Sequence, residues 1–194
     1  MIRRICVFCG SNRGTQPVFQ KAAVELGKLL AARGIVLVYG GGRVGLMGDL
    51  ADAVLAAGGE AIGVIPQALW DREVGHRSLT ELHVVATMHE RKALMADLAD
   101  AFLALPGGLG TFEEVFEVWT WAQLGMHQKP VGFLNVAGYY APLMSFLDQA
   151  VGAGFVRAAH RAMAIVADDA ERLLTRFAEY QPPTVEKWIK RGEE

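Results

Sequence analysis

The chain has 194 residues, and its 19 Lys and Arg nearly balance its 21 Asp and Glu, which gives a formal net charge of −2. A hydrophobic fraction of 52% with 21% charged residues is typical of a folded globular protein and excludes a disordered one. A general nucleic-acid binder would carry a basic excess, so we expect no nucleic-acid partner.

The sequence carries no pattern of a secretory leader or a membrane anchor. Residues 1–4 lead directly into a short apolar run, and no apolar stretch reaches the roughly 20 residues that a membrane-spanning helix needs. We therefore expect a soluble, cytoplasmic protein with no membrane partner. The length predicts one domain, over residues 1–180, followed by a C-terminal tail over 181–194.

Short apolar runs alternate along the chain with segments of helical periodicity. Strands are predicted over residues 2–8, 35–39, 61–65, 82–85, 101–105, 131–134 and 162–166. Helices are predicted over residues 18–32, 44–57, 89–98, 112–124, 140–151 and 169–178, and residues 67–80 are predicted to be loop with some helix. Strands that are apolar throughout are typical of a parallel sheet covered on both faces. The sequence therefore predicts a single-domain, Rossmann-like α/β fold: a doubly wound parallel sheet of about seven strands with helices on both faces.

Cys6 and Cys9 form a C-x-x-C pattern, which can indicate redox chemistry or a metal site. Both fall in the first predicted strand, where an odd spacing points the two side chains to opposite faces. Two cysteines alone also cannot complete a zinc site. We therefore predict buried, unreactive thiols.

Glycine-rich turns follow the first, second and fifth predicted strands, at residues 9–14, 40–45 and 106–111. The carboxyl ends of parallel strands share one edge of the sheet, where open α/β folds bind their ligands. Each turn leads toward a helix, whose N-terminal N–H groups bind anions that glycine allows to approach closely. Glycine could merely make tight turns, but three such turns at one edge favour a phosphorylated ligand.

The second turn, Gly40-x-Gly42-x-x-Gly45, fits the dinucleotide-binding fingerprint. The acidic residue that accompanies this fingerprint should end the next strand, but Glu60 precedes that strand and lies at the wrong end of it. No second domain is available to hold a hydride acceptor. A nicotinamide-linked enzyme is therefore the weaker alternative.

Thr111 and Glu114 form a T-x-x-E capping box, which would by itself explain an acidic residue at the start of a helix. Glu114 also shares a helical face with Val118 and Trp121, at i+4 and i+7, and this face is apolar. A carboxylate on an apolar face beside a phosphate-binding turn is a candidate catalytic group.

A second polar cluster, residues 88–92 (MHERK), follows the fourth predicted strand. It is not the zinc motif H-E-x-x-H, because Ala93 stands where the second His would be needed, and the remaining histidines lack metal-ligand spacing. We therefore assign no metal. Adjacent Arg and Lys often form a solvated surface pair, but the carboxyl end of a strand makes Arg91 and Lys92 candidate ligand contacts.

The predicted helix over residues 112–124 carries four large aromatic side chains and is apolar nearly all round: Phe112, Phe116, Trp119 and Trp121. Such a helix is buried in the core or against a partner. We predict a homodimer that uses this region, with the active site near the interface.

The motifs Pro106-Gly107-Gly108-x-Gly110-Thr111-x-x-Glu114, residues 88–92 and Gly40-Gly41-Gly42 together resemble the Lonely Guy (LOG) family of cytokinin riboside 5′-monophosphate phosphoribohydrolases. The similarity extends from about residue 4 to residue 180. It implies cofactor-free hydrolysis of the N-glycosidic bond of AMP or an N6-modified AMP, which gives free base and ribose 5-phosphate. Arg91 and Glu114 match the catalytic pair of that family.

The candidate substrate-binding positions come from the same motifs and from the glycine turns. They are Glu73, Met88, Arg91, Lys92, Gly108, Leu109, Gly110, Thr111, Phe112, Glu113, Glu114 and Thr120, with Ser11, Gly41 and Gly42. The family is also labelled lysine decarboxylase, but no second domain is present to enclose pyridoxal phosphate. A non-catalytic carrier of a nucleotide or phosphorylated cofactor is the alternative function, because a fold does not fix a function.

Overall fold

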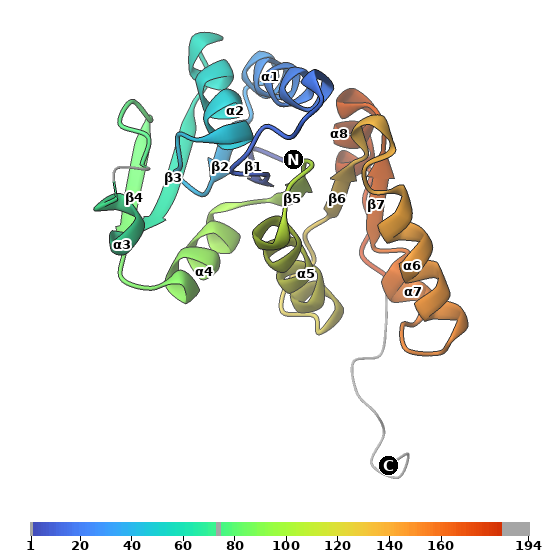
Figure 1. The fold of residues 1–194 in the computed structure, drawn as a ribbon. Helices are drawn as coiled ribbons and strands as arrows, with labels where there is room; N and C mark the ends of the chain where they lie inside the picture. The colour runs from blue at the N-terminus through green and yellow to red at the C-terminus, as the bar shows by residue number, and fades with distance from the viewer. Residues whose placement is uncertain (1, 73–74, 184–194) are drawn as a thin grey trace.

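The computed structural model describes residues 2–72 and 75–183. In this part of the chain seven strands form one parallel sheet, in the order β4-β3-β2-β1-β5-β6-β7 (Figure 1). The strands are β1 (Arg4–Phe8), β2 (Val36–Tyr39), β3 (Ala61–Pro66), β4 (Glu81–Val85), β5 (Ala101–Ala104), β6 (Val131–Leu134) and β7 (Ala164–Ala167). The helices are α1 (Pro17–Ala32), α2 (Gly45–Ala56), α3 (Gln67–Trp70), α4 (Met88–Leu98), α5 (Leu109–Gln123), η1 (Val136–Gly138), α6 (Ala141–Gly152), α7 (Ala158–Arg161) and α8 (Ala170–Ala178).

The sheet is buried between two helical layers. Helices α1, α2 and α8 cover one face of the sheet, and α4, α5 and α6 cover the other (Figure 1). Along β1, Ile5 and Val7 belong to the first core, whereas Cys6 and Phe8 belong to the second. This alternation follows from the two-residue period of a strand. Both faces need apolar side chains, which explains why the strands are apolar throughout and confirms the predicted doubly wound fold.

The strand order reverses between β1 and β5. The chain moves outward from β1 to β4 and then returns to place β5 on the other side of β1. Right-handed crossovers in the two directions place α1 and α2 on one face and α4 and α5 on the other. The loops after β1 and β5 therefore lead to opposite faces, and ligands bind in the crevice between such loops.

The predicted elements match the observed ones to within a few residues, with two short helices missed. α7 and η1 were not expected, and β7 begins two residues later than predicted. None of the helices in residues 2–72 and 75–183 has the length and apolar character needed to span a lipid bilayer. Most of the predicted tail over 181–194 lies outside the described residues.

The two cysteines are buried free thiols, as the strand pattern predicted. Cys6 belongs to one core and Cys9 to the other, and burial raises the pKa of both thiols well above the ordinary value. A thiol that is both buried and protonated is a poor nucleophile.

We therefore expect neither thiol to react with a water-soluble aromatic disulfide reagent in the folded protein. In denaturant, the 2 cysteines of the chain should both react. The absorbance of the released chromophore measures the number of reacted thiols in the folded and in the unfolded protein. A thiol that reacts as fast before unfolding as after it would contradict the observed burial.

Candidate active site

The glycine-rich turns after β1, β2 and β5 pack against one another through their backbones. The N–H of Gly10 donates to the carbonyl oxygen of Pro106 at 3.1 Å, and the carbonyl oxygen of Gly10 accepts from the N–H of Leu46 at 3.0 Å. Turns that are far apart in the sequence thus form one surface at the carboxyl edge of the sheet, as predicted.

Close backbone approach explains why glycine is needed in these turns. Gly45 has a positive φ of 59°, and a Cβ there would collide with the backbone of Ser11. A Cβ on Gly107 would collide with the side chain of Thr111 and would lie 2.8 Å from the nitrogen of Gly10. A side chain at either position would push the turns apart.

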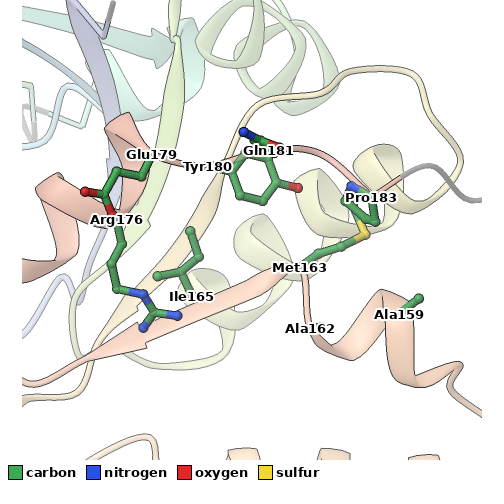
Figure 2. A pocket seen from close by; sticks show the side chains of 9 residues that line it. All are labelled: Ala159, Ala162, Met163, Ile165, Arg176, Glu179, Tyr180, Gln181 and Pro183. Atoms are coloured by element: carbon green, nitrogen blue, oxygen red, sulfur yellow. The ribbon is translucent and has the colours of Figure 1, made fainter.

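A pocket of about 260 Å³ lies over these turns. It is lined by residues 10–14, Phe19, Leu46, residues 106–108 and Tyr139. Two larger hollows lie elsewhere: one of about 400 Å³ beside the edge strand β7 (Figure 2), and one of about 750 Å³ at the amino ends of β1 and β2. Neither is lined by any of the predicted site residues, so size alone does not identify the site.

Arg91 and Glu114 form a buried ion pair beside the glycine turns. Arg91 Nη1 lies 2.9 Å from Glu114 Oε1, and the two side chains are only 11% and 12% exposed. Arg91 belongs to the first turn of α4, and Glu114 to the second turn of α5. The structure therefore brings together the two residues that the sequence predicted as the catalytic pair.

A backbone carbonyl of β3 and a side-chain sulfur of α4 hold the Arg91 guanidinium in place. Its Nε donates to the carbonyl oxygen of Val64 on β3 at 3.1 Å, and its Nη1 lies 3.1 Å from the sulfur of Met88. Gly40 provides the room, because a Cβ at that position would collide with the guanidinium. The solvated surface position considered for Arg91 is thus wrong.

Two side chains fix the start of α4, the N-cap Thr87 and Glu90, and neither role was predicted from the sequence. The hydroxyl oxygen of Thr87 accepts from the N–H of Glu90 at 3.1 Å, and Glu90 Oε2 accepts from the N–H of Ala86 at 3.0 Å. These bonds orient the helical turn that carries Arg91.

The predicted capping box at Thr111 and Glu114 is wrong. α5 begins two residues earlier than Thr111, with Gly108 as N-cap and no side-chain cap hydrogen bond. Thr111 is 4% exposed and packs against Gly107, so its hydroxyl is not available to cap the helix. Glu114 is thereby free of a capping role and faces Arg91.

Burial sets the electrostatics of Glu114. Desolvation raises the pKa of this carboxyl above its ordinary value, and the charge of Arg91 opposes that rise. A carboxyl group with a raised pKa beside a cation is typical of functional sites.

Lys92 forms ion pairs separate from that of Arg91 and links α4 to α5. Its Nζ lies 2.5 Å from Glu113 and 3.1 Å from Glu117, and the side chain is 8% exposed. Burial alone would lower the pKa of Lys92, but its hydrogen bonds to the two glutamates raise it. Lys92 thus ties the two helices together, and the carboxylate of Glu113 is occupied in the same cluster.

The remaining candidate residues divide into exposed and covered groups. Gly108, Leu109 and Gly110 are exposed at the start of α5, and Ser11 lines the pocket. Gly41 and Gly42 are buried: the carbonyl oxygen of Gly41 accepts from the N–H of His76, and Gly42 pairs with Gly75.

Three further candidates either lie outside the ion pair of Arg91 and Glu114 or fall outside the described residues. The ring of Phe112 packs edge-on against Tyr140. Thr120 is exposed six residues beyond Glu114, roughly 9 Å along α5. Glu73 lies outside the described residues.

Two features of the pocket were not found from the sequence. Tyr139, after β6, donates from its hydroxyl to the carbonyl oxygen of Gly107 at 2.5 Å. Arg13 forms two hydrogen bonds of 2.7 Å to Asp49 at the pocket rim. The position of Tyr139 after a strand was the available signal, because every such position reaches the same edge.

Two observations bear on the metal and dinucleotide interpretations of the sequence. Among the described residues, no group of three or more His, Cys, Asp or Glu side chains clusters in a way that could hold a metal ion. Glu60 precedes β3, at the edge of the sheet opposite the glycine turns.

Comparisons with known proteins match this chain to one family model and to closely similar plant proteins. Residues 47–177 match the family model described as "Possible lysine decarboxylase". The cytokinin riboside 5′-monophosphate phosphoribohydrolase LOG of Oryza sativa subsp. japonica is 56% identical over 93% of this chain and 74% of its own length. A protein of the same name from Arabidopsis thaliana, LOG7, is 53% identical over 93% of this chain and 83% of its own.

A solved structure with lower sequence identity has the same fold. The molybdenum cofactor binding protein of Rippkaea orientalis matches with a TM-score of 0.69 at 24% identity, over 92% of this chain and 97% of that chain. At this identity the match shows the fold alone, and the family follows from the closer sequence relatives. The chain therefore belongs to the family described as possible lysine decarboxylases, within its LOG group of cytokinin riboside 5′-monophosphate phosphoribohydrolases.

Proposed function

We propose that this chain hydrolyses the N-glycosidic bond of adenosine 5′-monophosphate, or of an N6-modified form, to free base and ribose 5-phosphate. The buried ion pair between Arg91 and Glu114 carries the proposal, because it sets a carboxylate about one helical turn beyond the exposed start of α5. The names of the relatives from rice and Arabidopsis support the same reaction.

The start of α5 suits the 5′-phosphate of such a substrate. The N–H groups of Gly108, Leu109, Gly110 and Thr111 precede the first i→i−4 hydrogen bond of the helix, which Phe112 donates to Gly108 at 3.1 Å. Unpaired N–H groups at a helix N-terminus bind anions, and the absence of side chains at two of these positions lets a phosphate approach.

The ion pair suits the other end of the ribose phosphate. As the bond from the anomeric carbon to the base breaks, positive charge develops on the sugar, and the Glu114 carboxylate stabilises it or orients the attacking water. The water oxygen bonds to the anomeric carbon, one water proton is released, and the base leaves with the electrons of the broken bond and takes up a proton. Arg91 keeps Glu114 ionised and positions the sugar.

Glu114→Gln tests this role, because it keeps the size of the side chain and removes its charge. We expect base release from AMP to fall by about 10²–10³, the usual effect of losing one electrostatic contact to a transition state. Chromatography of free adenine measures the rate, and circular dichroism checks that the variant is folded.

Glu117→Gln is the matched control on the same helix. It removes one of the two carboxylate partners of Lys92 and leaves Glu113 in place, so its rate should change far less. Wild-type turnover by Glu114→Gln would remove Glu114 from the mechanism. Tight AMP binding by the wild-type protein with no release of base would favour the carrier function instead.

The raised pKa of Glu114 predicts how the rate depends on pH. The reaction needs the ionised carboxylate, so kcat/KM, which reports the free enzyme, should fall on acidification with a midpoint above 4.5, the ordinary value for Glu. The fold binds this proton more tightly than the unfolded chain does, so protonation of Glu114 does not itself unfold the protein. Measurement of kcat/KM for AMP, with thermal unfolding followed at each pH, separates loss of the ionised carboxylate from loss of the fold. A midpoint at or below 4.5 would contradict the role of burial.

We also propose a homodimer in which the surface around α5 meets a second copy. Leu124 and Met126, at the end of α5, are 55% and 69% exposed, which is unusual for apolar side chains so close together. Thr120 stands exposed on the same helix, too far along it to reach the ion pair of its own chain. A neighbouring copy would let Thr120 approach a substrate in the partner's site.

Replacement of both Leu124 and Met126 by Asp should dissociate the dimer, because it places charges in an apolar contact. Light scattering should give twice 21.0 kDa for the wild type and 21.0 kDa for the variant. Phe155→Asp, at an 89% exposed apolar residue after α6, is the control and should stay dimeric. Dissociation by Phe155→Asp alone would place the interface elsewhere.

The cytoplasmic location and a domain ending at residue 180 are also part of the proposal. The domain boundary is supported by the position of α8, the last helix of the described residues, which ends at Ala178.

A further inference from the structure

The segment after β6 is held rigidly in a disfavoured conformation. Ala137 has a φ of 51°, which alanine rarely adopts, and it is the one non-glycine residue with positive φ in the part of the chain that the structure describes. Asn135 fixes the segment from both ends: its N–H donates to Ala167 at 2.8 Å, and its Oδ1 accepts from the N–H of Tyr140 at 2.7 Å. Strain that persists under such contacts suggests a function for what the segment presents.

The segment presents Tyr139 to the phosphate-binding turn. The hydroxyl of Tyr139 donates to the carbonyl oxygen of Gly107 at 2.5 Å. Its ring lies edge-on to Phe19 of α1, with centroids 5.7 Å apart, and forms one wall of the pocket of about 260 Å³. The hydroxyl of Tyr139 thus links the segment after β6 to the turn after β5 by a hydrogen bond.

The Gly107–Gly108 peptide needs an external bond of this kind. Glycine restricts the backbone less than any other residue, so the carbonyl and the N–H of this peptide are free to rotate together. A larger residue at position 107 cannot stiffen the turn, because its Cβ would collide with Thr111. The hydroxyl of Tyr139 supplies the missing constraint.

We propose that Tyr139 is a positioning residue for the substrate phosphate: its hydroxyl fixes the Gly107 peptide, and with it the orientation of the N–H groups that start α5. This rests on the proposed function, in which those N–H groups bind the 5′-phosphate. Tyr139 acts on the phosphate end of the substrate and leaves the base end unaffected.

The neighbouring tyrosine provides a matched control. The hydroxyl of Tyr140 donates to the carbonyl oxygen of Leu105 at 2.7 Å, so it makes the same bond to the same loop. Tyr140 is fully buried, however, and its ring packs edge-on against Phe133 in the core. Tyr140 should therefore contribute to stability and not to phosphate binding.

The test compares Tyr139→Phe with Tyr140→Phe in the full-length protein. For Tyr139→Phe we expect KM for AMP and the inhibition constant of ribose 5-phosphate to rise together by roughly 3- to 10-fold, the loss of one hydrogen bond. Its kcat, its inhibition constant for adenine and its melting temperature should change little. Tyr140→Phe should lower the melting temperature and leave both inhibition constants within about twofold.

The results distinguish a failure of the role of Tyr139 from a failure of the proposed reaction. An unchanged affinity for ribose 5-phosphate in Tyr139→Phe, or an equal loss in Tyr140→Phe, would overturn the role of Tyr139. A wild-type protein that releases no base from AMP would overturn the proposed reaction instead. In that case calorimetry with ribose 5-phosphate on the same two variants still decides whether Tyr139 positions the phosphate-binding turn.

Discussion

The buried ion pair between Arg91 and Glu114 is the interaction on which the rest of the site depends. Taking two charged groups out of water costs several kcal/mol per ion, and only good geometry with additional hydrogen bonds offsets that cost. Here the carbonyl oxygen of Val64 accepts from the guanidinium, and Gly40 leaves the space that it fills. A hydrophobic pair would fill the same space at no such cost, so stability alone does not explain these charges. Their proposed catalytic role beside the glycine turns does.

The glycine turns and the ion pair divide the work between backbone and side chains. The turns after β1 and β5 form much of the pocket, with the ring of Tyr139 as one wall, and the turns meet only because Gly45 and Gly107 allow close contact. Side chains of α4 and α5 supply the charges. Lys92 holds α4 and α5 together, because its side chain on α4 hydrogen-bonds to two glutamates on α5.

The sequence predicted the fold well because its signals are local. Apolar runs and glycine turns reveal strands and their ends wherever the sheet is buried on both faces. The T-x-x-E pattern was less reliable: it caps a helix at Thr87 and does not at Thr111, because only tertiary packing decides which hydroxyl is free. The hydrogen bond from Tyr139 to Gly107 could not be predicted from the sequence either, since it joins loops 32 residues apart and depends on the strand order.

One element spans both ends of the proposed substrate. The exposed start of α5 offers N–H groups at Gly108 to Thr111, and Glu114 follows on the same helix. A helical turn rises about 5.4 Å, which is of the same order as the span of ribose 5-phosphate from phosphorus to anomeric carbon. A regular helix cannot change this spacing without breaking its hydrogen bonds. In the proposed reaction, a phosphate bound at the helix start would place the bond to be cleaved near the carboxylate, so the backbone geometry of α5 would couple binding to reaction.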